Sequence, residues 1–170
     1  IGTEQNPINA DVQARILFIN NGSVSDTSQL SRGAILMGTT EVYGAAKTHR
    51  AVIFPPASSG DSSLTLTASP SGRQVGDQLI ITGTIVNDPK SDEIRTITSI
   101  NGAQIGLNSP LSLDHIAPKS DLNVYVANAT RNVIFASESQ TLMERCHNMF
   151  MHTLDVNINN ASFIVMGRTD

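Results

Sequence analysis

The sequence lacks tryptophan altogether and contains a single cysteine. One cysteine cannot form an intrachain disulfide, so Cys146 does not staple this stretch of chain. Aromatic residues make up only 4% of the chain, which leaves few flat rings for nucleic-acid bases or sugars to stack on. These absences argue against both a disulfide scaffold and a base-stacking surface.

Charge is scarce as well. Charged residues make up 15% of the chain, against about 25% in an average domain. The net charge is −4 and no basic run exceeds two residues, so no electrostatic footprint for nucleic acid or an anionic membrane surface is present. No run of about 18 apolar residues occurs, so we expect no membrane contact in this stretch.

Serine, threonine, asparagine and glycine take the place of charge, and they favour turns and strands over helix interiors. Short alternating or β-branched runs separated by turn signals predict an all-β fold. The pair Asn101-Gly102 between apolar flanks predicts a tight hairpin, and 137–146 is one weak helical candidate. The predicted strands cover residues 14–20, 63–68, 77–84, 94–100, 123–128, 131–137, 148–152 and 156–165.

The strand spacing changes after about residue 120. Apolar strand cores then recur with asparagine beside them, as in the segments 124–128, 132–135 and 155–160. Asparagine tolerates left-handed backbone and suits solenoid corners. Val133 and Val156 are 23 residues apart, close to one β-solenoid coil, and coils need neighbours to bury their core. We therefore expect a fragment of a larger chain.

Several segments together resemble the G-eight domain, a glycine-rich unit that leads into a right-handed parallel β-helix. The resemblance implies a G-eight-like all-β unit over 1–120 and the first β-helix coils over 121–170. It also implies an extracellular or cell-surface location, as in the hyaluronidase and fibrocystin relatives. The segments are IGTE with Pro7-Ile8, GAILMGTTEVYGAAKTH (33–49), SGRQVGDQLIITGT (71–84), DEIRTITSINGAQIGLNSPLSLDH (92–115), VANATRNVIFASES (126–139), MFMH and GRTD.

The sequence departs from the family pattern at aromatic positions. Gln74 stands where a tryptophan often precedes the glycine turn, and His49-Arg50 stands where animal members commonly have one. Aromatic faces are sugar platforms, so their loss argues against a hyaluronidase-type activity.

Four residues are the predicted glycan-binding set. Arg168 and Asp170 share a strand face, Arg131 lies on an earlier coil, and His152 ends an alternating run. Aligned on a solenoid wall, arginines could hold a sugar carboxylate in bidentate fashion. The alternative, which we favour, is a ladder of salt bridges between coils, or Arg168 capping the solenoid turn.

Three residues are weak catalytic candidates. Asp170 or Glu138 could act as a general acid or base in glycan cleavage. Lys47 occupies a position where the G-eight resemblance suggests a basic residue.

A metal site is not expected. His147 and His152 are five positions apart, which places them on opposite faces of a strand. Cys146 has no local nucleophile signature, so we favour a structural thiol or a cysteine paired with a segment outside this stretch. We expect no cofactor and leave bound calcium open.

These observations lead to three functional hypotheses. The first is a polysaccharide-binding module of a larger surface protein, a glycoprotein if sequons at Asn21, Asn128 and Asn160 are used. The second is a structural module whose coils stack on neighbouring subunits or on the rest of its own chain. The third is a glycan-cleaving enzyme. A binder should carry a concave row of Arg, Asp and His side chains along its coils. A structural module should show uninterrupted Ser, Thr and Asn outside, with apolar or main-chain contacts at its ends.

Overall fold

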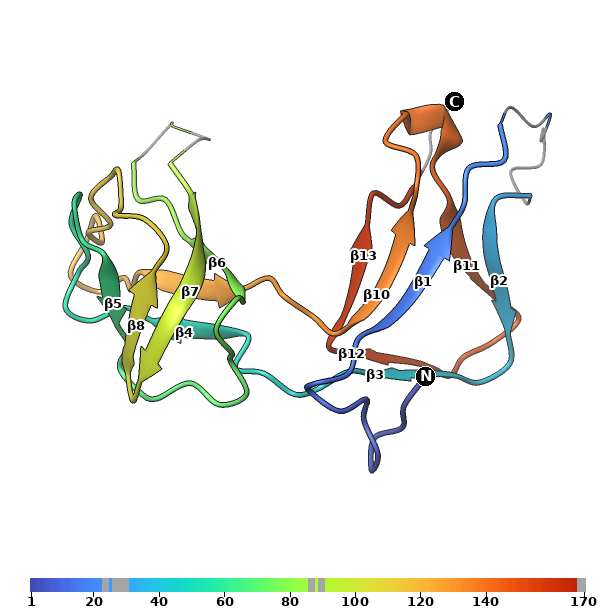
Figure 1. Cartoon of the computed structure of the whole chain (residues 1–170), viewed down its shortest axis with the longest axis horizontal. Coiled ribbons are helices and arrows are strands. Elements are labelled where there is room, and N and C mark those ends of the chain that lie inside the picture. The colour runs from blue at the N-terminus through green and yellow to red at the C-terminus, as the bar shows by residue number, and fades with distance from the viewer. Residues whose placement is uncertain (23–24, 26–30, 86–87, 89–90, 168–170) are drawn as a thin grey trace. The chain divides into compact units, whose positions relative to one another are not determined.

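The computed structural model describes residues 1–22, 25, 31–85, 88 and 91–167. In these residues the chain is all-β, with one 3-10 turn (Leu142–Glu144) and no α-helix. It divides into two compact units. Unit 1 joins Ile1–Ala46 to Arg131–Asp170, and unit 2 is the intervening Lys47–Thr130 (Figure 1).

Unit 1 is built from three parallel sheets made by successive passes of the chain. Strands of the second pass pair with those of the first, β10 with β1, β11 with β2 and β12 with β3, and β13 adds to β10 as a third pass. Figure 1 shows these strands side by side. The bounds are β1 (Ala14–Phe18), β2 (Gly33–Met37), β3 (Thr40–Tyr43), β10 (Val133–Ser137), β11 (His147–Met151), β12 (Val156–Asn159) and β13 (Ala161–Ile164).

Alternation along these strands builds the core of unit 1. Val42, Val133 and Phe135 are buried at its centre. Phe135 lies opposite Phe163 in the parallel register, and the two rings stack with centroids 5.0 Å apart and planes 9° apart. Residues in register on successive passes therefore stack into apolar ladders.

The passes approach closely at Gly33, which lies opposite His147. Gly33 has φ 138°, and a Cβ placed there would overlap the His147 carbonyl oxygen. Only glycine combines this backbone conformation with this approach.

Asn132 holds the start of the second pass against the first. Its Oδ1 accepts the Ala45 N–H at 2.8 Å, and its Nδ2 donates to the carbonyl oxygens of Asn9 and Val12 at 2.8 and 2.9 Å. The residue is 8% exposed. Its amide therefore satisfies the buried Ala45 N–H and also binds two partly buried carbonyl groups of the first pass.

We expect Asn132→Ala to lower the free energy of unfolding of unit 1 by about 1–3 kcal/mol, because it leaves the buried Ala45 N–H without a partner and removes two further hydrogen bonds. Urea titration followed by amide hydrogen exchange in β1 and β10 measures this change. The exposed Asn157→Ala is the control, with an expected change within about 0.5 kcal/mol. Equal protection in the two variants would contradict this role.

Unit 2 is a six-stranded antiparallel sheet in the order β4-β9-β6-β7-β8-β5. Its inward-facing apolar side chains form one core that includes Leu64, Leu79, Ile81 and Val126. The predicted hairpin is confirmed as β7–β8, with Gly102 at φ 58° in its turn. The bounds are β4 (Arg50–Val52), β5 (Ser63–Thr65), β6 (Gln78–Ile81), β7 (Glu93–Asn101), β8 (Gln104–Leu107) and β9 (Tyr125–Asn128).

A buried carboxylate ties β7 to the segment after β8. Glu93 accepts the Ser112 and Leu113 N–H groups at 2.9 Å and pairs with Arg95. His115, fully buried, has Nε2 3.0 Å from Glu93 Oε1. Burial by itself raises the pKa of Glu93, but the hydrogen bonds from Ser112, His115 and Leu113 and the charge of Arg95 outweigh it and lower the pKa from 4.5 to about 2.

The pKa of Glu93 is lower in the folded state than its ordinary value of 4.5. The contribution of Glu93 to the free energy of unfolding is therefore complete above pH 4.5 and is lost as the pH falls toward 2. The shift corresponds to about 3 kcal/mol. We expect unit 2 to lose stability over this range, and Glu93→Gln to flatten that loss. Hydrogen exchange of β7 amides across the pH range measures it, with the exposed Asp121→Asn as control. The same pH slope in Glu93→Gln and the parent would refute this linkage.

The structure corrects several expectations from the sequence. The expected boundary at residues 120 and 121 falls inside unit 2, and the first pass of unit 1 comes from the N-terminal residues. Val133 pairs with Ala161, whereas Val156 pairs with Thr40 in another sheet. The prediction that Val133 and Val156 are equivalent positions one 23-residue coil apart was therefore wrong. Only a 3-10 turn forms in the helical candidate 137–146. The described residues form parallel passes without closing a right-handed β-helix.

Candidate functional site

The outer face of the β3–β12 sheet carries a compact group of polar side chains. Glu41 lies opposite Asn157, and Tyr43 lies opposite Asn159. The residues between them on each strand pack into the core of unit 1, so these four side chains point outward by strand alternation. We call this group (Glu41, Tyr43, Asn157 and Asn159) the Tyr43 strip.

Carboxylates surround the phenol of this strip. Partial desolvation raises the pKa of Tyr43 above its ordinary value, and the charges of Glu4, Glu41 and Asp155 raise it further. A side-chain hydrogen bond with Asn159 acts in the opposite direction and is the smaller effect. The phenol therefore stays protonated and can donate a hydrogen bond at neutral pH.

The geometry of the strip suits hydrogen bonding to a flat, hydroxyl-rich ligand. Neighbouring strands lie about 4.8 Å apart, and outward residues recur about every 6.6 Å along a strand. Amide, carboxylate and phenol groups supply both donors and acceptors on this grid. Asn157 also donates to Asp155 at 2.8 Å, which orients its amide. No member of the strip is basic, so its field disfavours anionic ligands.

The predicted binding residues are only partly placed. Arg168 and Asp170 lie outside the described residues. Arg131 precedes β10, whereas His152 follows β11 at a corner with φ 52°. Arg131 and His152 thus flank strands of two different sheets. The expected row of Arg, His and Asp side chains stays a prediction.

The catalytic candidate Glu138 contacts main chain. Its Oε2 accepts the N–H of Asn20 at 2.7 Å, which joins the ends of β10 and β1. This contact gives Glu138 a structural role at the strand ends.

The catalytic candidate Lys47 is buried. Its ammonium lies 2.6 Å from Asp77, and both side chains are less than 5% exposed. Asn128 donates to the other oxygen of Asp77 at 2.7 Å. The paired Lys47 is closed to a polysaccharide, and the buried Asn128 is equally closed to glycosylation in this fold.

Cys146 is buried at the start of β11, where its N–H donates to Ser137 Oγ at 2.7 Å. This position agrees with a structural thiol. Within the described part of the chain, no three His, Cys, Asp or Glu side chains converge in a way that could hold a metal ion. A search of the same residues finds no helix with the length and apolar character needed to cross a membrane.

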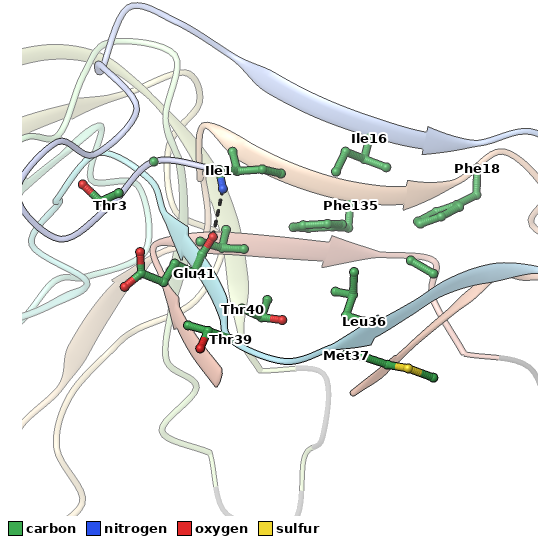
Figure 2. Close-up of a pocket in the computed structure, with 13 residues that line it drawn as sticks. Ile1, Thr3, Ile16, Phe18, Leu36, Met37, Thr39, Thr40, Glu41 and Phe135 are labelled. Atoms are coloured by element: carbon green, nitrogen blue, oxygen red, sulfur yellow. Dashed lines mark hydrogen bonds between the residues drawn. The ribbon is translucent and has the colours of Figure 1, made fainter. Parts of the chain in front are cut away.

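An apolar cavity of about 560 Å³ opens at the first pass of unit 1. β1, β2 and β3 each pair with the second pass on one side. The other edge of β3 is hydrogen-bonded to the N-terminal segment, through Ile1 and Ile8. Figure 2 shows Ile16, Phe18, Phe135 and Leu36 pointing into the space between their strands. The N-terminal ammonium of Ile1 donates to the Glu41 carbonyl oxygen at 2.9 Å beside the cavity. The apolar side chains between β1, β2 and β3 are therefore accessible at the first pass of unit 1.

Sequence reasoning missed the Tyr43 strip. The alternation in Val156-Asn157-Ile158-Asn159 was visible, but its asparagines were interpreted as corners. Of the asparagines at 157, 159 and 160, Asn160 alone has left-handed backbone, with φ 53°. Placing Tyr43 beside Asn159 required the pairing of distant strands, which no local pattern encodes.

No protein-family model and no curated protein matches the sequence, so the G-eight resemblance stays a prediction. Solved structures with partial similarity include three phage tailspikes. The tailspike gp61 of Pseudomonas phage phi297 has 16% identity and a TM-score of 0.42, with 90% of this chain and 22% of that chain covered. The Gp54 tailspike of Acinetobacter baumannii bacteriophage AP22, solved with an A. baumannii capsular saccharide, has 11% identity and a TM-score of 0.41, with 87% and 26% covered. The tailspike gp49 of Pseudomonas phage LKA1 has 15% identity and a TM-score of 0.38, with 62% and 20% covered. This chain thus spans about a quarter or less of each tailspike.

Proposed function

We propose that the chain is a polysaccharide-binding module of a larger extracellular or cell-surface protein. The observation that carries this proposal is the Tyr43 strip, where an aromatic ring and three hydrogen-bonding side chains face outward in register. A sugar ring presents an apolar face to an aromatic ring and hydroxyls to amides and carboxylates.

The parallel passes of unit 1 support a solenoid framework for this module. Each of the three sheets pairs the first pass with the second in parallel, as coils of a right-handed parallel β-helix would. Unit 2 contains two of the segments that resemble the G-eight domain, 71–84 and 92–115. Additional coils would extend the row of outward polar side chains along the ligand.

The charge of the strip favours a neutral or amino-bearing polysaccharide over an acidic one. Glu4, Glu41 and Asp155 all act on Tyr43, and no salt bridge among the described residues involves any of these three carboxylates. An anionic sugar would meet like charge there. This preference differs from the arginine-held acidic sugar expected from the sequence.

Binding of dextran, chitosan and hyaluronan to the full-length protein tests the proposal. We expect Tyr43→Ala/Asn157→Ala to weaken binding of dextran or chitosan at least tenfold, about 1.4 kcal/mol, because it removes the ring and one amide. Calorimetry measures the affinities. Arg15→Ala, an exposed residue on β1, is the matched control and should bind like the parent.

Unchanged affinity in the folded double variant would reject the strip as the binding surface. Tighter binding of hyaluronan than of dextran and chitosan would reject the charge argument. Depolymerisation that disappears in Glu41→Gln, with binding retained, would move the assignment to a glycan-cleaving enzyme.

The open cavity favours a second candidate function, a structural module that stacks on another β-structure. Within the described residues β1 and β2 each have one edge without a strand partner, and such edges beside an apolar interior invite pairing with a further coil. Ile16 is 36% and Met37 63% exposed at this end.

We expect Leu36→Glu to abolish any self-association of the full-length protein, because it places a charge in the cavity. Sedimentation velocity measures the oligomeric state, and Arg15→Glu, outside the cavity, is the control. A monomeric parent protein, or self-association that survives in Leu36→Glu, would exclude stacking of copies through this end.

A further inference from the structure

A second cavity lies entirely within unit 2, where β4 ends and β9 begins. β4 and β9 pair antiparallel, with Val52 opposite Tyr125, and Ile53 N–H donates to the Val124 carbonyl at 2.9 Å. The chain leaving β4 and the loop entering β9 enclose a space of about 290 Å³. We call this space the Phe54 pocket; its lining includes Phe54, Pro56, Ile116, Lys119, Leu122 and Asn123.

The walls of the Phe54 pocket are apolar and accessible. Phe54 is 66%, Ile116 52% and Leu122 49% exposed. Ile53 and Val124 belong to the buried core and form a rigid floor. Large apolar side chains gathered around one hollow mark a binding surface more often than scattered ones do.

Three polar side chains stand at the pocket without partners. Lys119, Ser120 and Asn123 line it, and none makes a side-chain hydrogen bond or ion pair with the residues the structure describes. Asp121 is two positions from Lys119, but no ion pair joins them. One cation and two neutral polar groups are therefore available to a ligand.

We propose that the Phe54 pocket binds a small monoanion that has an apolar body and one carboxylate. The carboxylate pairs with Lys119, and an aryl or branched alkyl group lies against Phe54 and Leu122. The volume is near the lower end of the about 300–1,000 Å³ usual for ligand sites, which suits a single ring.

The composition of the pocket argues against other ligand classes. A free sugar would place several hydroxyls against apolar walls that cannot bond them, at a cost in free energy. A phosphate dianion would need a second cation, and Lys119 is the one basic residue among the described residues that line the pocket.

The same chemistry could come from a free small acid or from the C-terminal residue of a peptide. The probes are therefore 3-phenylpropionate, its uncharged amide, and N-acetyl-phenylalanine, which carries the amide and carboxylate of a peptide end. Two-dimensional NMR titration of the full chain measures each affinity and locates the perturbed residues. At least tenfold tighter binding of N-acetyl-phenylalanine than of 3-phenylpropionate would identify a peptide terminus, and the reverse order or equal affinity would identify a free acid.

We expect 3-phenylpropionate or N-acetyl-phenylalanine to perturb the resonances of residues 53–56 and 116–124. The amide should bind at least tenfold more weakly than 3-phenylpropionate. Lys119→Gln should weaken the carboxylates at least tenfold, Lys119→Arg should stay within threefold of the parent, and Phe54→Ala should weaken acid and amide alike.

Equal affinity for acid and amide, unchanged binding in Lys119→Gln, or no perturbation of these residues would overturn the proposal. Lys119 is exposed, so its variants test binding without disturbing the core. The Phe54 pocket and the Tyr43 strip share no residue, so this experiment and the polysaccharide test succeed or fail separately.

Discussion

Parallel pairing between two distant passes of the chain is the constraint on which unit 1 depends. Ala14 pairs with Val133, Gly33 with His147 and Thr40 with Val156, at separations of 114 to 119 positions. Bringing such residues together costs conformational entropy, which grows slowly with the length of the closed loop. The aligned ladders and the amide of Asn132 offset that cost, and they also place Tyr43 beside Asn159.

Local strand structure could be predicted from the sequence because alternation is a local property. The runs at 14–20, 131–137 and 148–152 all contain strands, and the Asn101-Gly102 turn closes the predicted hairpin. The segment 33–43 was not predicted as strand, because glycines interrupt its apolar pattern. Gly33 is required by its contact with the next pass, which a local sequence window does not reveal, whereas Gly38 has open space around it and φ 74°.

The candidate site was harder to predict than the strands. Charged residues drew attention to the chain end, where Arg168 and Asp170 lie outside the described residues. The Tyr43 strip combines residues from two passes, so neither half stands out alone. Lys47 shows the converse difficulty, because a lysine in a glycine-rich motif suggests function, whereas the fold buries it against Asp77.

Unit 2 interrupts unit 1 in a way that leaves each unit closed on itself. Unit 1 is left after Ala46 and re-entered at Arg131, and one hydrogen bond joins the adjacent residues Ala45 and Asn132. In unit 2 the chain enters through β4 and leaves through β9, which pair with each other. Each unit thus has neighbouring ends at the junction, the arrangement that domain insertion tolerates best. Unit 2 therefore has the arrangement of an inserted domain, because no strand of unit 1 pairs with any of its strands among the described residues.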